Sequence, residues 1–447
     1  MRKRLPVLIL LSIPVVCLLS VALYFLPPVH SRLAWRLENL RTQVRYVLNP
    51  PEQVVFVPQQ GETSLIQDSA ARATIDVIVQ ATLQALTPAP THTVFPTQPG
   101  PTVTPQPSPT ATVTPSPVPE KVILAGFRHE FQQMNNCGPT TLAMALSFWG
   151  WQGNQTDTRA VLRPNYTRID DKNVMPEEMV FYTQDYSAQK AITRVGGDLG
   201  LLKSFIAAGF PVIIEKGLQD HPGDWMGHYA LFTGYDDAVQ QFVTQDSYTG
   251  PGKNVKVPYE KMQGGRWRDF NYVYLVIYPP EQEAQVMRLL GPQADQEYNF
   301  RYAADKALAE IDQLTGRDRY FAWFNLGSNL TGLGDYAGAA EAFDQAFAIY
   351  PNISKDDRPW RMLWYRTEPY AAYYQTGRYQ DVINLGNQTL DLVGKPILEE
   401  TMFWLGMARE AQGDLEKAIA DYKTAVDINP NSTPALERLQ RLGVGYP

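Results

Sequence analysis

Cys137 is the residue of this sequence that is best placed to act as a nucleophile. It stands directly before Gly138 and Pro139, where a run of apolar residues at helical spacing begins. Unpaired N–H groups and the helix dipole favour an anion at such an end, so we expect a lowered thiol pKa. The other cysteine, Cys17, lies in an apolar N-terminal run and is not an expected disulfide partner. The helix position alone is equally compatible with a small cysteine buried in the core.

A histidine and an aspartate could provide the base for this thiol and the group that orients the base. His228 opens a strand-like run, a turn follows at Asp237, and the returning strand ends at Asp246. If the hairpin is centred on Asp237, the two residues lie opposite each other on one side of the sheet, with β-carbons about 5 Å apart. Asp246 would accept from one imidazole nitrogen and leave the other for the thiol. A register slip of one residue would break this match.

Glutamines that precede the cysteine could stabilise the charge that forms during acyl transfer. Attack on a carbonyl puts negative charge on its oxygen, and N–H donors can hold that oxyanion. We predict that the side-chain amide of Gln132 does so together with the backbone N–H of Cys137, with Gln133 as the alternative. Trp225, which comes shortly before His228, is predicted to border the substrate cleft.

A helix and a sheet must bring these side chains together. The apolar spacing predicts a helix over residues 139–149, with Pro139 in its first turn and Gly150 just past its end. The apolar runs at 210–215 and 272–278 are typical of strands, and they would extend the sheet that contains the hairpin.

The combined motifs resemble one group of peptidases. The motifs at Gln132, Asn135–Pro139, Gly227–Tyr229 and Gln245–Ser247 are similar, in this order, to those of papain-like cysteine peptidases of the bacteriocin-processing (double-glycine leader) group. The similarity is greatest to the stand-alone, secreted relatives, and it covers roughly residues 120–280. It implies a papain-like α+β domain in which the helix that bears the cysteine packs on an antiparallel sheet.

The resemblance also implies roles for the site residues. Cys137 would be the nucleophile, His228 the base, Asp246 the residue that orients the base, and Gln132 the oxyanion donor. The best-known members precede an ATP-driven exporter and cut leader peptides that end in two glycines. Because this sequence shows neither exporter helices nor a P-loop, we do not expect that substrate. The expected activity is peptide-bond hydrolysis; the alternatives are an acyltransferase or amidase on the same scaffold, or a non-catalytic surface adaptor.

The N-terminal end of the sequence predicts a membrane anchor. Residues 5–26 carry no charge and are nearly all apolar, which is enough to cross a bilayer. Basic residues at 2–4 would keep the short tip in the cytoplasm and place the rest outside. The alternative is a signal peptide cleaved near Ala22. We assign residues 1–30 to the tip and the transmembrane helix, and an outside location without stapling disulfides indicates a bacterial surface protein.

Two segments separate the predicted anchor from the peptidase domain, which we assign to residues 120–285. Residues 31–87 are predicted to form a juxtamembrane helical region, amphipathic over 31–48. Residues 88–119 are dominated by proline and threonine and cannot bury a core, so we expect an extended linker. At about 3.1 Å per residue it could span on the order of 100 Å and hold the peptidase domain away from the membrane.

The last third of the sequence, residues 292–447, predicts an all-α array of tetratricopeptide repeats. The repeat pattern is matched at Trp323, Leu326, Gly327, Leu330, Ala339, Phe343, Ala346 and Pro351. It recurs from Leu405 to Pro430, with a degenerate repeat near Gly377–Ile383 between the two, and residues 298–314 would add a leading helix. Such arrays usually present a groove to a peptide or protein; the alternative is a structural cap on the neighbouring domain.

Composition narrows the expected partners. The net charge of −7 gives no indication of a nucleic-acid partner. His221 and His228 are seven residues apart with no cysteine nearby, which is not a metal-ligand cluster, so we expect neither a metal nor a cofactor. The expected partners are a protein or peptide substrate, a protein in the repeat groove, and the membrane.

Overall fold

The computed structural model of the 447-residue chain describes its folded part and a few short N-terminal pieces. The described residues are 23–25, 40, 55–59, 118–165, 173–219, 222–248, 250–393 and 398–446. The predicted anchor, juxtamembrane helices and linker fall almost entirely outside them and stay predictions. Within the described ranges, no helix has both the length and the apolar character needed to cross a bilayer.

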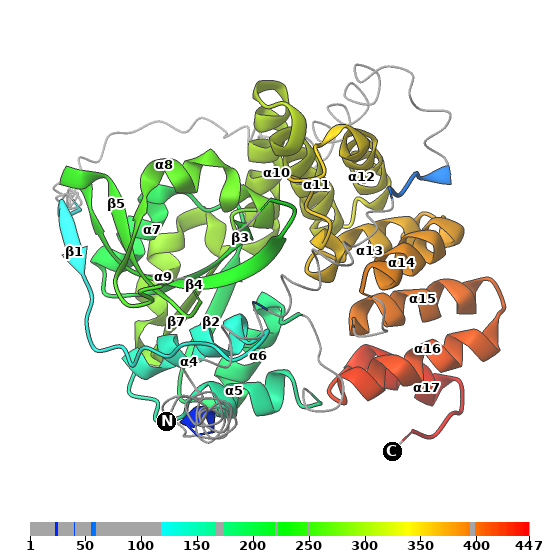
Figure 1. Cartoon of the computed structure of the whole chain (residues 1–447), viewed down its shortest axis with the longest axis horizontal. Helices are drawn as coiled ribbons and strands as arrows, with labels where there is room; N and C mark the ends of the chain where they lie inside the picture. Colours follow the sequence, from blue (N-terminus) through cyan, green and yellow to red (C-terminus); the bar gives the residue numbers. More distant parts are fainter. Residues whose placement is uncertain are drawn as a thin grey trace, which may run out of the picture.

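An antiparallel sheet of seven strands lies at the centre of the first domain (Figure 1). Its strands pair in the order β2-β7-β3-β4-β5-β6, and β1 pairs with β4. In chain order they are β1 (Lys121–Ile123), β2 (Lys190–Arg194), β3 (Val212–Gln219), β4 (Trp225–Asp236), β5 (Gln241–Asp246), β6 (Val255–Pro258) and β7 (Tyr274–Tyr278). The strands predicted over 210–215 and 272–278 are thus confirmed as β3 and β7, with shifted bounds.

Helices cover both faces of this sheet. The α4, α5 and α6 helices pack on one face, and α7 and α9 pack on the other. Their bounds are α4 (Cys137–Phe148), α5 (Gln155–Leu162), α6 (Pro176–Tyr186), α7 (Leu199–Ala207) and α9 (Glu283–Leu290). Successive side chains of a strand point to opposite faces. Accordingly, Ile213 of β3 joins the core beneath α4, whereas Val212 and Ile214 join the core beneath α7.

The α4 helix carries the cysteine, as the sequence predicted. It begins at Cys137 itself and ends at Phe148, and Gly150 follows with a φ of +84°. A positive φ favours glycine, which explains why the helix stops there. Residues Gly138 to Ser147 are all buried, so α4 is a core helix and its amino end is fixed by packing.

The C-terminal third of the chain forms antiparallel helix pairs. Its helices are α10 (Gln296–Gln313), α11 (Gly316–Gly332), α12 (Tyr336–Ile349), α13 (Glu368–Gln375), α14 (Tyr379–Val393), α15 (Glu399–Ala411), α16 (Leu415–Ile428) and α17 (Thr433–Arg441). The repeat pattern acts through close helix approach. A β-carbon on Gly327 would lie 2.7 Å from the ring of Phe343, and one on Gly406 would lie 2.5 Å from the ring of Tyr422. The predicted leading helix is confirmed as α10.

The sheet domain and the repeats share one hydrophobic core. Trp225, at the start of β4, stacks on Phe270 with ring centroids 5.7 Å apart. Its ring also lies 6.0 Å from the ring of Phe321 in α11 and 6.0 Å from that of Tyr365, between α12 and α13. Aromatic contacts of this kind bury large apolar areas. The two regions therefore form one continuous body.

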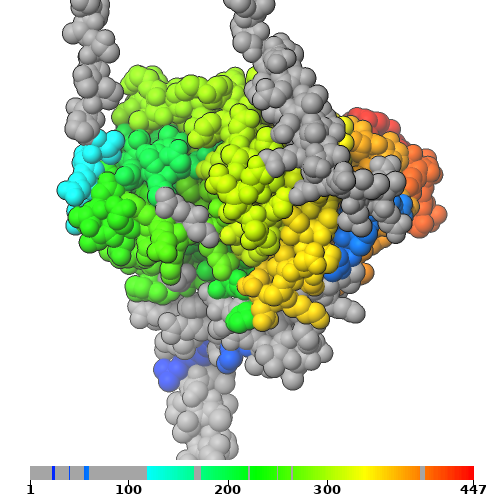
Figure 2. Space-filling model, turned by 90° about the horizontal axis from the view of Figure 1, so that it is seen from above, coloured from blue at the N-terminus to red at the C-terminus, as the bar shows by residue number. Residues whose placement is uncertain are grey.

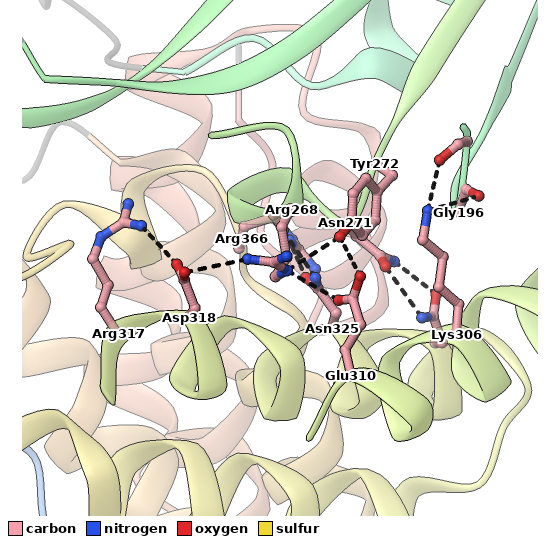
Figure 3. A network of polar contacts seen from close by, with 12 residues as sticks. Gly196, Arg268, Asn271, Tyr272, Lys306, Glu310, Arg317, Asp318, Asn325 and Arg366 are labelled. Atoms are coloured by element: carbon pink, nitrogen blue, oxygen red, sulfur yellow. Dashed lines mark hydrogen bonds and ion pairs between the residues drawn. The ribbon is translucent and has the colours of Figure 1, made fainter. Parts of the chain in front are cut away.

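A network of polar contacts borders this shared core (Figure 3). Arg268 Nε donates to Glu310 Oε2 of α10 at 3.0 Å, and the hydroxyl of Tyr272 donates to the same carboxylate. Lys306 Nζ donates to the carbonyl oxygen of Gly197 at 2.7 Å and lies 3.4 Å from the centroid of the Tyr272 ring. Burial lowers the pKa of Lys306 to about 8. The α10 helix is thus held to the sheet domain by charge as well as by packing.

Candidate active site

Cys137 is a half-buried free thiol at the first residue of α4. Burial raises the pKa of the thiol, but the hydrogen bond and the charge of His228 lower it by more. The backbone N–H groups of Tyr229 and Gly138 lower it further, so the pKa lies below the ordinary thiol value. The amino end of α4 lowers the thiol pKa through the N–H of Gly138, and this effect is smaller than that of the His228 imidazole. A thiolate is the nucleophilic form of cysteine.

His228 links this thiol to Asp246. Its Nε2 lies 2.9 Å from Oδ1 of Asp246, which leaves Nδ1 for the thiol of Cys137. Both side chains of the histidine–aspartate pair are almost fully buried. Burial lowers the pKa of His228, but the charge and hydrogen bond of Asp246, and then those of Cys137, raise it to about 9. Because the imidazole holds its proton more tightly than usual and the thiol releases its own more easily, the pair favours thiolate and imidazolium.

The predicted register of the hairpin is wrong by two residues. Asp246 pairs with Ala230, and the register shifts between Phe232 and Gly234 because β4 contains one extra residue there. His228 is two positions beyond Ala230 and so points to the same side of the sheet as Asp246. The two side chains meet diagonally rather than directly across the strands. Diagonal neighbours are still within reach of a long side chain.

Asp246 is itself held by neighbours that sequence reasoning missed. Its Oδ1 accepts from the backbone N–H of Tyr248 at 2.9 Å, and Lys216 Nζ lies 3.8 Å from its Oδ2. Lys216 is the β3 residue directly opposite His228. The side chains of this cross-strand pair therefore lie side by side, and both contact the same carboxylate. No local spacing marks Lys216, because its role depends on how β3 and β4 pair.

Gln132 is fixed to the residue that follows Asp246. Its backbone N–H donates to the carbonyl oxygen of Ser247 at 2.9 Å, and Ser247 Oγ donates to Gln132 Oε1 at 2.8 Å. The amide NH2 of Gln132 is thus the end that is left to donate. Gln133 has a different environment, since its Oε1 accepts from Arg159 and its own side chain is exposed. Gln132 is therefore the better placed of the two candidates.

Gln155 of α5 organises the loop that leads into the cysteine, and sequence reasoning missed it. Its Oε1 accepts from the backbone N–H of Gln133 at 2.8 Å, from Asn136 Nδ2 at 3.0 Å and from Thr140 Oγ1 at 3.1 Å. Its Nε2 donates to the carbonyl oxygen of Phe131 at 2.8 Å. One buried amide thus joins the loop to the first turn of α4. Its position in the sequence gives no signal of this role.

The prediction that Trp225 borders the substrate cleft is wrong. Its side chain is fully buried, and its Nε1 donates to Asp269 Oδ2 at 2.8 Å. Trp225 is the first residue of β4 and lies in the core shared with the repeats. Tyr365 also lies against this end of β4. A β-carbon on Gly227 would lie 2.9 Å from its ring, so the ring fills the space that a side chain there would need.

A buried carboxyl group is close enough to the thiol to feel its charge. Glu215 is 5% exposed and is directly opposite Tyr229 in the pairing of β3 with β4. Burial raises the pKa of Glu215 well above its ordinary value, and the negative charge of Cys137 raises it further. A raised pKa favours the neutral form of the carboxyl group, which opposes the thiolate less than a carboxylate would. Among the described residues, no group of three or more His, Cys, Asp or Glu side chains could hold a metal ion.

Comparisons with known proteins agree with the motif analysis. Residues 125–275 match the model of the Peptidase_C39 like family, and residues 320–353 and 399–432 match that of the tetratricopeptide repeat. A solved structure described as a C39-like peptidase, from Bacillus anthracis, is 20% identical over 35% of this chain and 96% of its own, with a TM-score of 0.30. Xylellain, a cysteine protease from Xylella fastidiosa, is 16% identical over 36% of this chain and 86% of its own, with a TM-score of 0.30. A search of curated proteins finds no match.

Proposed function

We propose that this chain, which contains a C39-like peptidase domain and tetratricopeptide repeats, is a cysteine peptidase with Cys137 as nucleophile. The observation that carries the proposal is that the Cys137 thiol interacts with His228, whose Nε2 lies 2.9 Å from Asp246 Oδ1. A nucleophile, a base and a group that orients the base are the parts that acyl transfer requires. The directions of the two pKa shifts support a thiolate–imidazolium pair near neutral pH.

The proposed reaction has two steps. In the first, the Cys137 sulfur attacks the carbonyl carbon of a peptide bond, and the imidazolium of His228 gives its proton to the departing amine. In the second, His228 takes a proton from water, the resulting hydroxide attacks the thioester, and the sulfur leaves as thiolate. The histidine is then again an imidazolium beside a thiolate. Asp246 keeps the imidazole oriented and stabilises its positive charge in both steps.

The oxyanion of each step would be held by amide donors. The NH2 group of Gln132 is the proposed side-chain donor, because Ser247 already binds the carbonyl end of that amide. The backbone N–H of Cys137 is the proposed second donor. Donors that are fixed before the reaction stabilise developing charge without reorganisation. The contacts of Gln155 with the loop before Cys137 support this fixed arrangement.

We further propose that the peptidase is anchored in a membrane through residues 5–26 and acts outside the cytoplasm on a peptide or protein. The run of uncharged residues and the basic residues before it support this location. The repeats would bind a protein substrate or partner. The competing activity is transfer of the acyl group to an amine, which the same thioester permits.

The full chain tests this proposal with three cysteine and histidine variants. Cys137→Ala should abolish peptide hydrolysis and the alkylation of this position by iodoacetamide, whereas Cys17→Ser, which changes the other cysteine, should leave both intact. His228→Ala should keep the thiol but lose most of the hydrolysis. Undiminished cleavage by Cys137→Ala, in a preparation with native circular dichroism, would refute the assignment. Product analysis with and without an added amine then distinguishes hydrolysis from acyl transfer.

A further inference from the structure

A short segment far upstream of the peptidase domain lies on the repeats. Residues 55–59 have no strand or helix assigned over their first four positions, and they contact α12, α13 and α14. Figure 1 draws this segment in blue beside these helices, and Figure 2 shows it on the surface next to the repeats. More than 50 residues separate it from the first strand of the peptidase domain at Lys121. Such a contact is not set by chain proximity and needs its own explanation.

Apolar contacts hold one side of the segment. Phe56 is 5% exposed, and its ring lies 5.1 Å from the ring of Phe347 in α12, edge to face. It also lies 6.1 Å from the ring of Tyr373 in α13. Pro58 is buried as well, whereas Val57 between them is 60% exposed. This alternation is what an extended peptide shows when one of its sides faces a receptor.

A buried carboxylate binds the backbone of the segment. The N–H of Gln59 donates to Asp381 Oδ1 of α14 at 2.9 Å, and Asp381 is only 2% exposed. Its second oxygen, Oδ2, accepts from Arg378 Nε at 2.8 Å. Arg378 also binds Asp344 of α12, whose Oδ1 accepts from the hydroxyl of Tyr373 at 2.8 Å. The carboxylate is thus held in place by the repeats, with one oxygen directed to a peptide N–H.

The geometry of this carboxylate indicates a site for peptide backbone. Without the segment, Asp381 Oδ1 would lose the N–H donor that it has in the structure. Loss of a partner from a buried polar atom costs about 1–3 kcal/mol. Proline at 58 cannot donate, so the next N–H, that of Gln59, is the one that reaches the carboxylate. The repeats therefore contact the aromatic ring of Phe56, the side chain of Pro58 and the backbone N–H of Gln59 within one short segment.

We propose that Phe347, Tyr373 and Asp381 form a peptide-binding site of the repeats, hereafter the Phe56 site, and that residues 55–59 are its intramolecular ligand. The site takes an extended peptide with an aromatic residue, any residue, a proline and a free N–H on the next residue. This assignment is independent of the peptidase chemistry. The residues on either side of 60–117 then both contact the same folded body, because residues 55–59 bind the repeats and β1 pairs with β4.

Binding of a separate peptide tests the site on the full chain. The probe is a fluorescein-labelled synthetic peptide that corresponds to residues 52–62, followed by fluorescence anisotropy. The intramolecular segment competes at an effective concentration on the order of millimolar. We therefore expect the variant Phe56→Ser with Pro58→Ser to bind the probe at least tenfold more tightly than the unmodified chain. Val57→Ser, which changes the exposed residue between them, should behave like the unmodified chain.

The peptide itself provides the control for the carboxylate contact. A probe methylated at the Gln59 nitrogen keeps every side chain but lacks the donor for Asp381, and it should bind the double variant at least tenfold more weakly. Equal affinity of the two probes, or no gain of probe binding in the double variant, would overturn the proposal. A second measurement does not depend on the fold of the double variant. In an otherwise unmodified chain, a protease site is inserted near residue 90 and then cleaved. The N-terminal fragment should stay bound to the folded body, and its release would also overturn the proposal.

Discussion

The effect of Asp246 on the pKa of His228 can be measured through the reactivity of the thiol. The step from the ordinary imidazole value of 6.5 to about 9 corresponds to about 3 kcal/mol in favour of the imidazolium, at about 1.36 kcal/mol per pKa unit. Burial opposes this step, and the charge and hydrogen bond of Asp246 are its largest favourable causes. Asp246→Asn keeps an oxygen for His228 Nε2 and for the N–H of Tyr248 but removes the charge. We therefore expect the pKa of His228 to fall and that of Cys137 to rise.

The sign of the expected change follows from the coupling of the two groups. The imidazolium lowers the thiol pKa, so thiolate is present in the unmodified chain at pH values below the ordinary thiol pKa. When the histidine is neutral at such pH, the thiolate loses its stabilising charge and its hydrogen-bond donor weakens. The rate of iodoacetamide alkylation at pH 6 should fall by about 10- to 100-fold, because one to two pKa units of the pair are lost. The midpoint of the rate–pH profile should move to higher pH.

The matched control is Asp236→Asn, which removes one carboxylate from the other end of β4. Asp236 pairs with Lys121 at 2.7 Å and lies eight residues from His228 along the strand. Its variant should show the alkylation profile of the unmodified chain. Thermal unfolding of both variants reports whether the fold is kept. If the alkylation profiles of Asp246→Asn and the unmodified chain coincide, Asp246 does not stabilise the His228 imidazolium, and the proposed role of Asp246 is wrong.

Four further outcomes are expected. Peptide hydrolysis, followed as kcat/KM against pH, should decline above about pH 9, because His228 then lacks the proton for the departing amine; a rate that is level to pH 10.5 would contradict this. Gly227→Ala should lower the free energy of unfolding by about 1–3 kcal/mol, since its β-carbon would lie 2.9 Å from the Tyr365 ring, and an unchanged denaturant midpoint would argue against that contact. Glu215→Gln should leave the alkylation midpoint in place, because the raised pKa of the carboxyl group favours its neutral form, whereas a lower midpoint would reveal an ionised glutamate. Gln155→Leu should reduce kcat while the alkylation midpoint persists, because it removes the acceptor that binds the loop before the nucleophile; the opposite pattern would place Gln155 in the ionisation of the thiol.

The sequence predicted correctly that His228 and Asp246 meet, although it predicted the wrong register for their strands. The direct pairing was wrong because the turn lies further along the chain than a centre at Asp237 implies, and the extra residue of β4 near Phe232 offsets only part of that shift. The total error is two residues, and side chains in a strand return to the same side every second position. An error of one residue would have put the imidazole on the opposite face of the sheet.

Other features of the site could not be read from local patterns. The helix that carries Cys137 is encoded by apolar spacing and a terminal glycine, both of which are local signals. Lys216 and Gln155 act through contacts between segments that are far apart in the sequence. Their positions depend on strand pairing and helix packing, which no spacing rule supplies. The repeat pattern likewise identified the helix pairs but gave no indication of which surface they bury.

The burial of Trp225 shows how closely the repeats are joined to the proposed catalytic residues. This side chain begins the strand that bears His228, and it is buried because Phe321 of α11 and Tyr365 cover it. Without the repeats, the indole and its neighbour Phe270 would be exposed, at a cost of about 1.5–3 kcal/mol for each large apolar side chain. A chain cut at the domain boundary suggested by the sequence, near residue 285, would therefore be destabilised at the strand that positions the base. If the proposed Phe56 site binds peptide, the repeats are both a binding surface and a wall of the core that positions His228.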